Sequence, residues 1–134
     1  MALILFLHIA ITAYCLKQFF KLRDQTGFHL GMNIAMLTGG FSGLITGMVI
    51  IDYFPFYFVF LTLVAAVAGG LTGAVTGLFY DGQTALTGLS NGFMMGLMGP
   101  MIGAAAGGLT ILPVMLEIIY VCLIALALTS VVKS

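Results

Sequence analysis

Two ionisable side chains interrupt long apolar segments of this chain: His8 near the N-terminus and Glu117 near the C-terminus. An ionisable group inside a bilayer is costly and usually has a partner or a function. At helical rise, each would lie roughly 10 Å below the same membrane surface. We therefore predict a His8–Glu117 contact that docks the first helix on the last. Such a pair could be purely structural, or it could carry protons, because histidine side chains exchange protons near neutral pH.

Methionine is the second residue type that could do chemistry, and most of the nine methionines fall in two segments. In the first segment, His29, Met32 and Met36 are spaced so that they share one helix face. The second segment has the same kind of face, formed by Met94, Met98 and Met101. Thioether sulfur is a soft ligand suited to Cu(I), so all six are candidate metal ligands and copper is the candidate cofactor. The alternative is that flexible methionines fill gaps opposite glycine.

Glycine recurs about every fourth residue in three segments, two of which, 39–47 and 69–77, repeat one nine-residue pattern. This spacing leaves one helix face without side chains, and membrane helices associate through such close packing. We predict glycine-zipper contacts at Gly39, Gly43, Gly47, Gly69, Gly73, Gly77, Gly92, Gly96, Gly99, Gly103 and Gly107. Hydroxyl side chains lie beside the first two stripes, where they either line a polar path or bond the carbonyl one turn back. These hydroxyls belong to Thr38, Ser42, Thr46, Thr72 and Thr76.

The composition is that of a membrane protein. Of the 134 residues, 62% are hydrophobic and 6% are charged, and the formal net charge is zero. Soluble domains carry about a quarter charged residues. We predict an all-α, polytopic transmembrane helix bundle that forms a single integral membrane domain over residues 1–134. The absence of a basic cluster argues against nucleic acid as a partner.

A membrane helix needs about 20 mostly apolar residues. Five segments meet this requirement, at about 1–20, 31–51, 56–80, 84–109 and 111–132. Three of the four basic residues, Lys17, Lys21 and Arg23, close the first segment, and the fourth, Lys133, is near the C-terminus. Basic residues favour the cytoplasmic side. We therefore expect a plasma (inner) membrane protein with its N-terminus outside and its C-terminus in the cytoplasm.

Short motifs resemble parts of two known families. Met32 and Met36, with the glycine stripes, resemble the Met-x-x-x-Met and Gly-x-x-x-Gly motifs of Ctr-type copper transporters, although those have three spans instead of five. Gly31-Met32-Asn33 is similar to the Gly-Met-Asn signature of CorA-type magnesium channels. Each resemblance covers a handful of residues, and neither assigns the chain to a family.

Two hypotheses about function follow from these features. The first is a small oligomeric membrane transporter or channel, with a soft metal cation such as Cu(I) as the leading candidate. The second is a non-catalytic structural or assembly subunit of a larger membrane complex. The expected partners are membrane lipid and either further copies of the chain or that complex. No residue pattern typical of a catalytic site is present, so we do not expect an enzyme.

Overall fold

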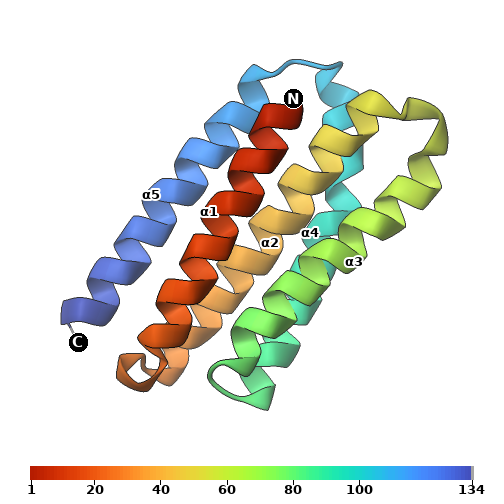
Figure 1. The fold of residues 1–134 in the computed structure, drawn as a ribbon. Helices are drawn as coiled ribbons and strands as arrows, with labels where there is room; N and C mark the ends of the chain where they lie inside the picture. Colours follow the sequence, from red (N-terminus) through yellow and green to blue (C-terminus); the bar gives the residue numbers. More distant parts are fainter. Residues whose placement is uncertain (134) are drawn as a thin grey trace.

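Five long helices form the protein in a computed structural model that describes residues 1–133 (Figure 1). They are α1 (Ala2–Lys21), α2 (Phe28–Tyr53), α3 (Phe58–Leu78), α4 (Gly82–Ala106) and α5 (Ile111–Lys133). Two short 3₁₀ helices, η1 (Arg23–Gln25) and η2 (Pro55–Tyr57), lie in the first two connections. The described residues contain no strand. The predicted all-α bundle is therefore confirmed.

Four segments among the described residues are long and apolar enough to cross a membrane: Ala2–Gln25, Phe28–Tyr53, Pro55–Leu78 and Ile111–Lys133. The predicted fourth span, at 84–109, corresponds to α4 and is not among them. It has 25 residues, but its sequence includes six glycines together with Ser90 and Asn91, which reduce its hydrophobicity. The four apolar helices indicate an integral membrane protein, and α4 belongs to the same bundle because it packs along α2 and α3.

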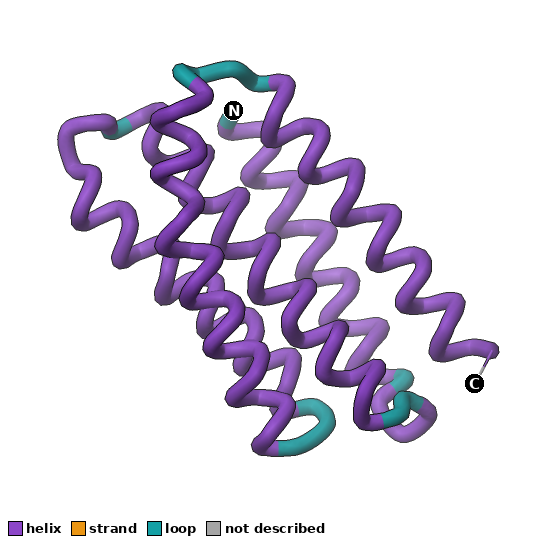
Figure 2. Tube along the Cα trace, turned by 180° about the vertical axis from the view of Figure 1, so that it is seen from behind, coloured by secondary structure: helices purple, strands orange, loops and turns teal. Residues whose placement is uncertain are grey.

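The helices are arranged in two parts. α2, α3 and α4 pack closely on one another, whereas α1 and α5 make sparser contacts with α2 and with each other. Figure 2 shows the bundle from the opposite side, with all connections at its two ends. The N-terminus lies at one end and the C-terminus at the other (Figure 1). The sparser packing around α1 leaves room for the grooves described below.

The backbones of α2, α3 and α4 approach one another at glycine residues. A Cβ atom built on Gly39 would lie 2.7 Å from the Cα of Gly73, and one on Gly43 would lie 2.7 Å from the carbonyl oxygen of Gly92. At ten of the eleven predicted packing glycines, an added Cβ would come within 3.0 Å of another helix. A side chain at these positions would therefore push the helices apart.

At the remaining position, Gly107, the predicted role in helix packing was wrong. The structure ends α4 at Ala106 instead of at residue 109, and Gly107 has a φ of 62°. This left-handed conformation closes a helix and favours glycine, so Gly107 is a helix cap. A Cβ atom there would meet nothing within 4 Å. Conversely, the predicted set omitted Gly88, where an added Cβ would collide with the backbone of Gly73.

Candidate polar site inside the helix bundle

The structure brings together the two ionisable residues that were predicted to pair. His8 Nδ1 lies 2.8 Å from Glu117 Oε2, and both side chains are buried. Each residue belongs to the inward face of its helix. The buried positions of α1 are His8, Thr12, Cys15 and Phe19, which follow helical spacing. The face of α5 that packs toward them carries Pro113, Glu117, Tyr120 and Ile124.

Three further polar side chains extend the pair into a network. Ser42 Oγ of α2 lies 3.2 Å from His8 Nε2, and Thr12 Oγ1 lies 3.4 Å from the same nitrogen. Thr12 Oγ1 also lies 3.2 Å from the hydroxyl oxygen of Tyr120. All of these side chains are buried. The network therefore joins α1, α2 and α5 through polar contacts inside an apolar bundle.

Sequence reasoning missed these three residues. Thr12 follows His8 by four positions, and Tyr120 follows Glu117 by three, so each shares a helix face with an ionisable residue. That spacing is a usable signal. Ser42 was predicted only as one member of a hydroxyl stripe, because its proximity to α1 depends on how the helices pack.

Glu117 is only partly satisfied. Its Oε2 atom contacts His8, but its Oε1 atom is buried and has no hydrogen-bond partner among the described residues. A buried carboxylate oxygen without a partner carries a desolvation penalty. An added proton, a water molecule or a cation would relieve it. Glu117 Oε1 is thus the open position of the network.

The contacts of His8 fit either hydrogen-bonding role of its Nε2 atom. With Glu117 ionised, His8 Nδ1–H donates to Oε2, and His8 Nε2 is free to accept from the Ser42 or Thr12 hydroxyl. Protonation of Nε2 reverses that second bond, because each hydroxyl oxygen can also accept. The neutral and protonated states of His8 therefore both find partners in the same geometry.

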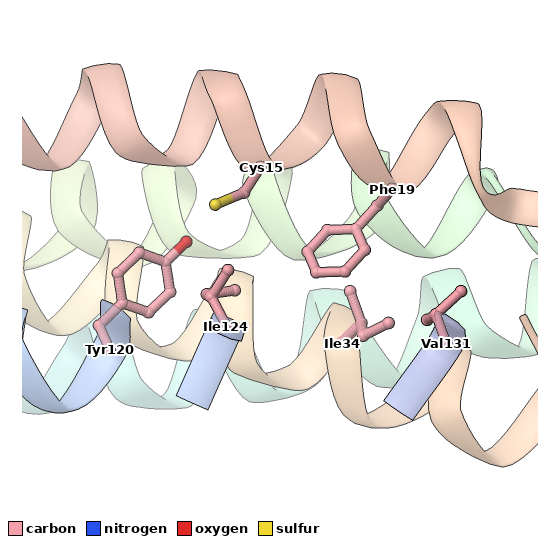
Figure 3. Packing of buried hydrophobic residues seen from close by; sticks show 6 residues of the cluster. All are labelled: Cys15, Phe19, Ile34, Tyr120, Ile124 and Val131. Atoms are coloured by element: carbon pink, nitrogen blue, oxygen red, sulfur yellow. The ribbon is translucent and has the colours of Figure 1, made fainter. Parts of the chain in front are cut away.

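An apolar cluster supports the network (Figure 3). It comprises Cys15, Phe19, Ile34, Tyr120, Ile124 and Val131, all buried between α1, α2 and α5. The Tyr120 ring belongs to both groups: it packs in the cluster, 5.3 Å from the Phe41 ring centroid, and its hydroxyl contacts Thr12. This packing holds α5 in the register that places Glu117 beside His8.

The candidate metal ligands do not converge in one place. Met94, Met98 and Met101 are exposed by 64%, 49% and 61% on the outer side of α4. On α2, Met32 and Met36 are half-buried and His29 is exposed. Helical spacing predicts one face for each set, but it cannot indicate whether that face is directed inward. Among the described residues, no group of three or more His, Cys, Asp or Glu side chains could hold a metal ion.

A contact between α2 and α4 does bring two methionine segments close. Asn91 Nδ2 donates a hydrogen bond of 2.7 Å to the Met36 carbonyl oxygen. A Cβ atom on Gly40 would lie 3.4 Å from Met95 Cγ. Gly40 therefore lets Asn91 and Met95 lie against α2, one turn beyond Met36. The α4 methionine at this contact is thus Met95, which was not among the candidate ligands.

These observations define a helical integral membrane protein with a buried histidine–carboxylate network. Comparison with protein-family models, with curated proteins and with solved structures found no match to the chain. Its function must therefore be inferred from its own residues.

Proposed function

We propose that the protein is a small membrane transporter in which the His8–Glu117 pair takes up and releases protons. The observation that carries this proposal is the buried 2.8 Å contact between the two side chains, with Glu117 Oε1 left unpartnered. Ionisable residues within membrane helices commonly mark proton or substrate pathways. A purely structural link would not require a carboxylate oxygen to remain unsatisfied.

Proton flux into liposomes tests the proposal. The purified protein is reconstituted in potassium-loaded vesicles that contain a pH-sensitive dye, and valinomycin then sets an inside-negative potential. We expect the wild type to acidify the lumen and Glu117→Gln to reduce the rate at least tenfold. Asp52→Asn is the matched control, because it removes a carboxylate at the C-terminal end of α2 that takes no part in the His8–Glu117 network, so it should leave the rate unchanged. Equal rates for the wild type and Glu117→Gln would contradict the proposal.

A soft metal cation is the second candidate substrate, and the contact of Asn91 and Met95 with α2 favours it. The half-buried Met32 and Met36 lie on the same helix as Gly40, and Met94, Met98 and Met101 are exposed nearby on α4. We propose that these sulfur atoms form a continuous path when copies of the chain associate, because a homo-oligomer would cover the exposed stripe. Thioether ligands would favour Cu(I) over harder ions.

A structural or assembly subunit is the alternative. The close glycine contacts of α2, α3 and α4 support it, since a glycine zipper makes a rigid unit that can present outer faces to a larger complex. In this case, the exposed methionine stripe of α4 would contact a partner protein. Native mass spectrometry in mild detergent separates the two: a homo-oligomer supports the transporter, and co-purified larger partners support the subunit.

We further propose that the end with the α1–α2 connection faces the cytoplasm. Lys17 and Lys21 lie in the last turns of α1, Arg23 lies in the α1–α2 connection, and Lys133 is the last residue of α5. The C-terminal ends of α1 and α5 lie at the same end of the bundle as this connection (Figure 1). The distribution of basic residues sets orientation in membranes. The N-terminus would then lie outside.

A further inference from the structure

A cavity of about 470 Å³ lies directly beside the polar network, between α1, α2 and α3. Its walls are mainly aliphatic side chains of α1 and α3, and its polar lining includes His8, Ser42 and Thr46. It opens to the outside of the bundle, where Ile9, Leu71 and Val75 are each exposed. Ligand sites typically have this size and combine apolar walls with a few convergent polar groups. The opening faces the membrane, so a ligand would enter from the lipid phase.

A second groove of similar size shows that the polar lining, and not the volume, sets the first cavity apart. It lies between α1 and α5, has a volume of about 430 Å³, and is lined almost wholly by apolar side chains. Lipid chains would fill such a groove without hydrogen bonding. The α1–α2–α3 cavity is nearly the same size but presents an imidazole and several hydroxyls. Its polar groups, not its volume, indicate a specific ligand.

The polar groups of the cavity define the head of that ligand. The Thr46 hydroxyl has no hydrogen-bond partner among the described residues, so its proton is free to be donated. The Thr72 hydroxyl already donates to the Ala68 carbonyl at 2.8 Å. The one ionisable side chain in the lining, His8, already contacts Glu117 at 2.8 Å, so it is not available to pair with an ionic ligand. An uncharged hydrogen-bond acceptor is what these groups complement.

We infer that this cavity binds a membrane-dissolved molecule with an apolar body and an uncharged carbonyl head, which accepts a hydrogen bond from Thr46 beside His8 and Ser42. This inference rests on the proposed function in one respect. If the protein is a transporter, the ligand of this cavity is its substrate, bound next to the proton site. Two sources share this chemistry, a quinone and the ester of a neutral glyceride.

Photolabelling tests the inference in phosphatidylcholine vesicles that contain the full chain. The probe is a monoacylglycerol with a diazirine in its acyl chain, and labelled residues are mapped by mass spectrometry. We expect saturable labelling of α1 and α3 around the cavity and non-saturable labelling in the α1–α5 groove. Unlabelled monoacylglycerol and a decyl-tailed benzoquinone serve as competitors. The stronger competitor identifies the source, and competition by neither overturns the inference.

Paired substitutions on α1 provide the matched control. Ala13 lines the cavity and Ala10 lines the α1–α5 groove, and both side chains are exposed, so a larger residue at either position should leave the fold intact. We expect Ala13→Phe to reduce saturable labelling at least tenfold and Ala10→Phe to leave it unchanged. Thr46→Val, which keeps the shape of the side chain, should weaken binding about fivefold, the value of one ordinary hydrogen bond. Equal effects of the two phenylalanines would overturn the inference.

The outcomes separate this inference from the proposed function. Saturable labelling together with a proton flux that Glu117→Gln does not change would support the cavity and contradict transport. Loss of saturable labelling, with a flux that depends on Glu117, would overturn the cavity alone.

Discussion

The His8–Glu117 contact places an ionisable pair where water cannot solvate it. Loss of one member of such a pair leaves the other as an uncompensated buried group, whereas replacement of both by apolar side chains is often neutral or stabilising. The contribution of the pair is therefore best measured by comparing single with double substitutions. A purely additive result would mean that the two residues do not act together.

We predict that His8→Leu destabilises the protein by about 3–5 kcal/mol, because it strands Glu117 in the bundle. The double variant His8→Leu/Glu117→Leu should recover most of that loss. Thermal unfolding in detergent, followed by circular dichroism, measures both effects. A double variant less stable than either single one would show that the pair is not a coupled unit.

The Thr12–Tyr120 contact allows a finer test of the network. Tyr120→Phe removes a hydroxyl but leaves the ring in the apolar cluster, so it should cost about 1 kcal/mol. Thr12→Val should cost more, about 1–3 kcal/mol, because the buried Tyr120 hydroxyl would then lack a partner. The same unfolding measurement compares them, and the reverse order would argue against this hydrogen bond.

At the scale of single helices, close approach at glycine explains why α2, α3 and α4 form the tightly packed part of the bundle. In lipid, helices associate through packing and hydrogen bonds because burial of apolar surface offers little advantage there. Glycine disfavours an isolated helix by about 1 kcal/mol relative to alanine. The backbone contacts must therefore offset this preference.

Gly73→Ala should separate α3 from α4 and destabilise the protein by about 1–3 kcal/mol, because its Cβ would collide with the backbone of Gly88. Gly27→Ala is the matched control. It lies in the connection before α2, has a φ of −68°, and an added Cβ would meet nothing within 4 Å. Unfolding in detergent should distinguish the two. Equal stability of both variants would contradict the packing account.

Sequence patterns predicted the five helices closely, because each is an apolar run broken by polar or helix-ending residues. The predicted end of α4, at residue 109, was wrong because the apolar sequence continues beyond the true end of the helix. The helix ends earlier, since Gly107 and Gly108 both have positive φ. His8 and Glu117 could be paired because charged groups are rare in such helices and their depths could be counted. The partner Ser42 could not be predicted, since hydroxyl residues are common in membrane helices and usually bond their own backbone.

At the scale of the whole molecule, the possible function of the methionines depends on whether their helix faces are directed into the bundle or out of it. Helical spacing predicted shared methionine faces, but the exposure of Met94, Met98 and Met101 means that one chain does not enclose a sulfur-lined path. A copper path therefore requires association of several copies. If the protein carries copper, we therefore expect the copper in an oligomer and not in a single chain.

We predict that replacing Met32, Met36, Met94 and Met98 by leucine changes stability by less than about 1.5 kcal/mol per residue, because the swap nearly conserves volume. If the protein carries Cu(I), the same variant should lose it. Elemental analysis together with native mass spectrometry measures both copper content and subunit number. Copper retained by the fourfold variant would rule out these sulfurs as ligands.

Proton exchange by the buried pair is the central claim, and infrared difference spectroscopy of the reconstituted protein tests it most directly. Spectra recorded at two pH values report whether a carboxyl group gains a proton within the bundle. The account predicts a carboxyl band that changes with pH in the wild type, is absent in Glu117→Gln, and persists in Asp52→Asn. A spectrum in which Glu117→Gln removes no pH-dependent carboxyl signal would contradict it, since the pair would then be a fixed structural link.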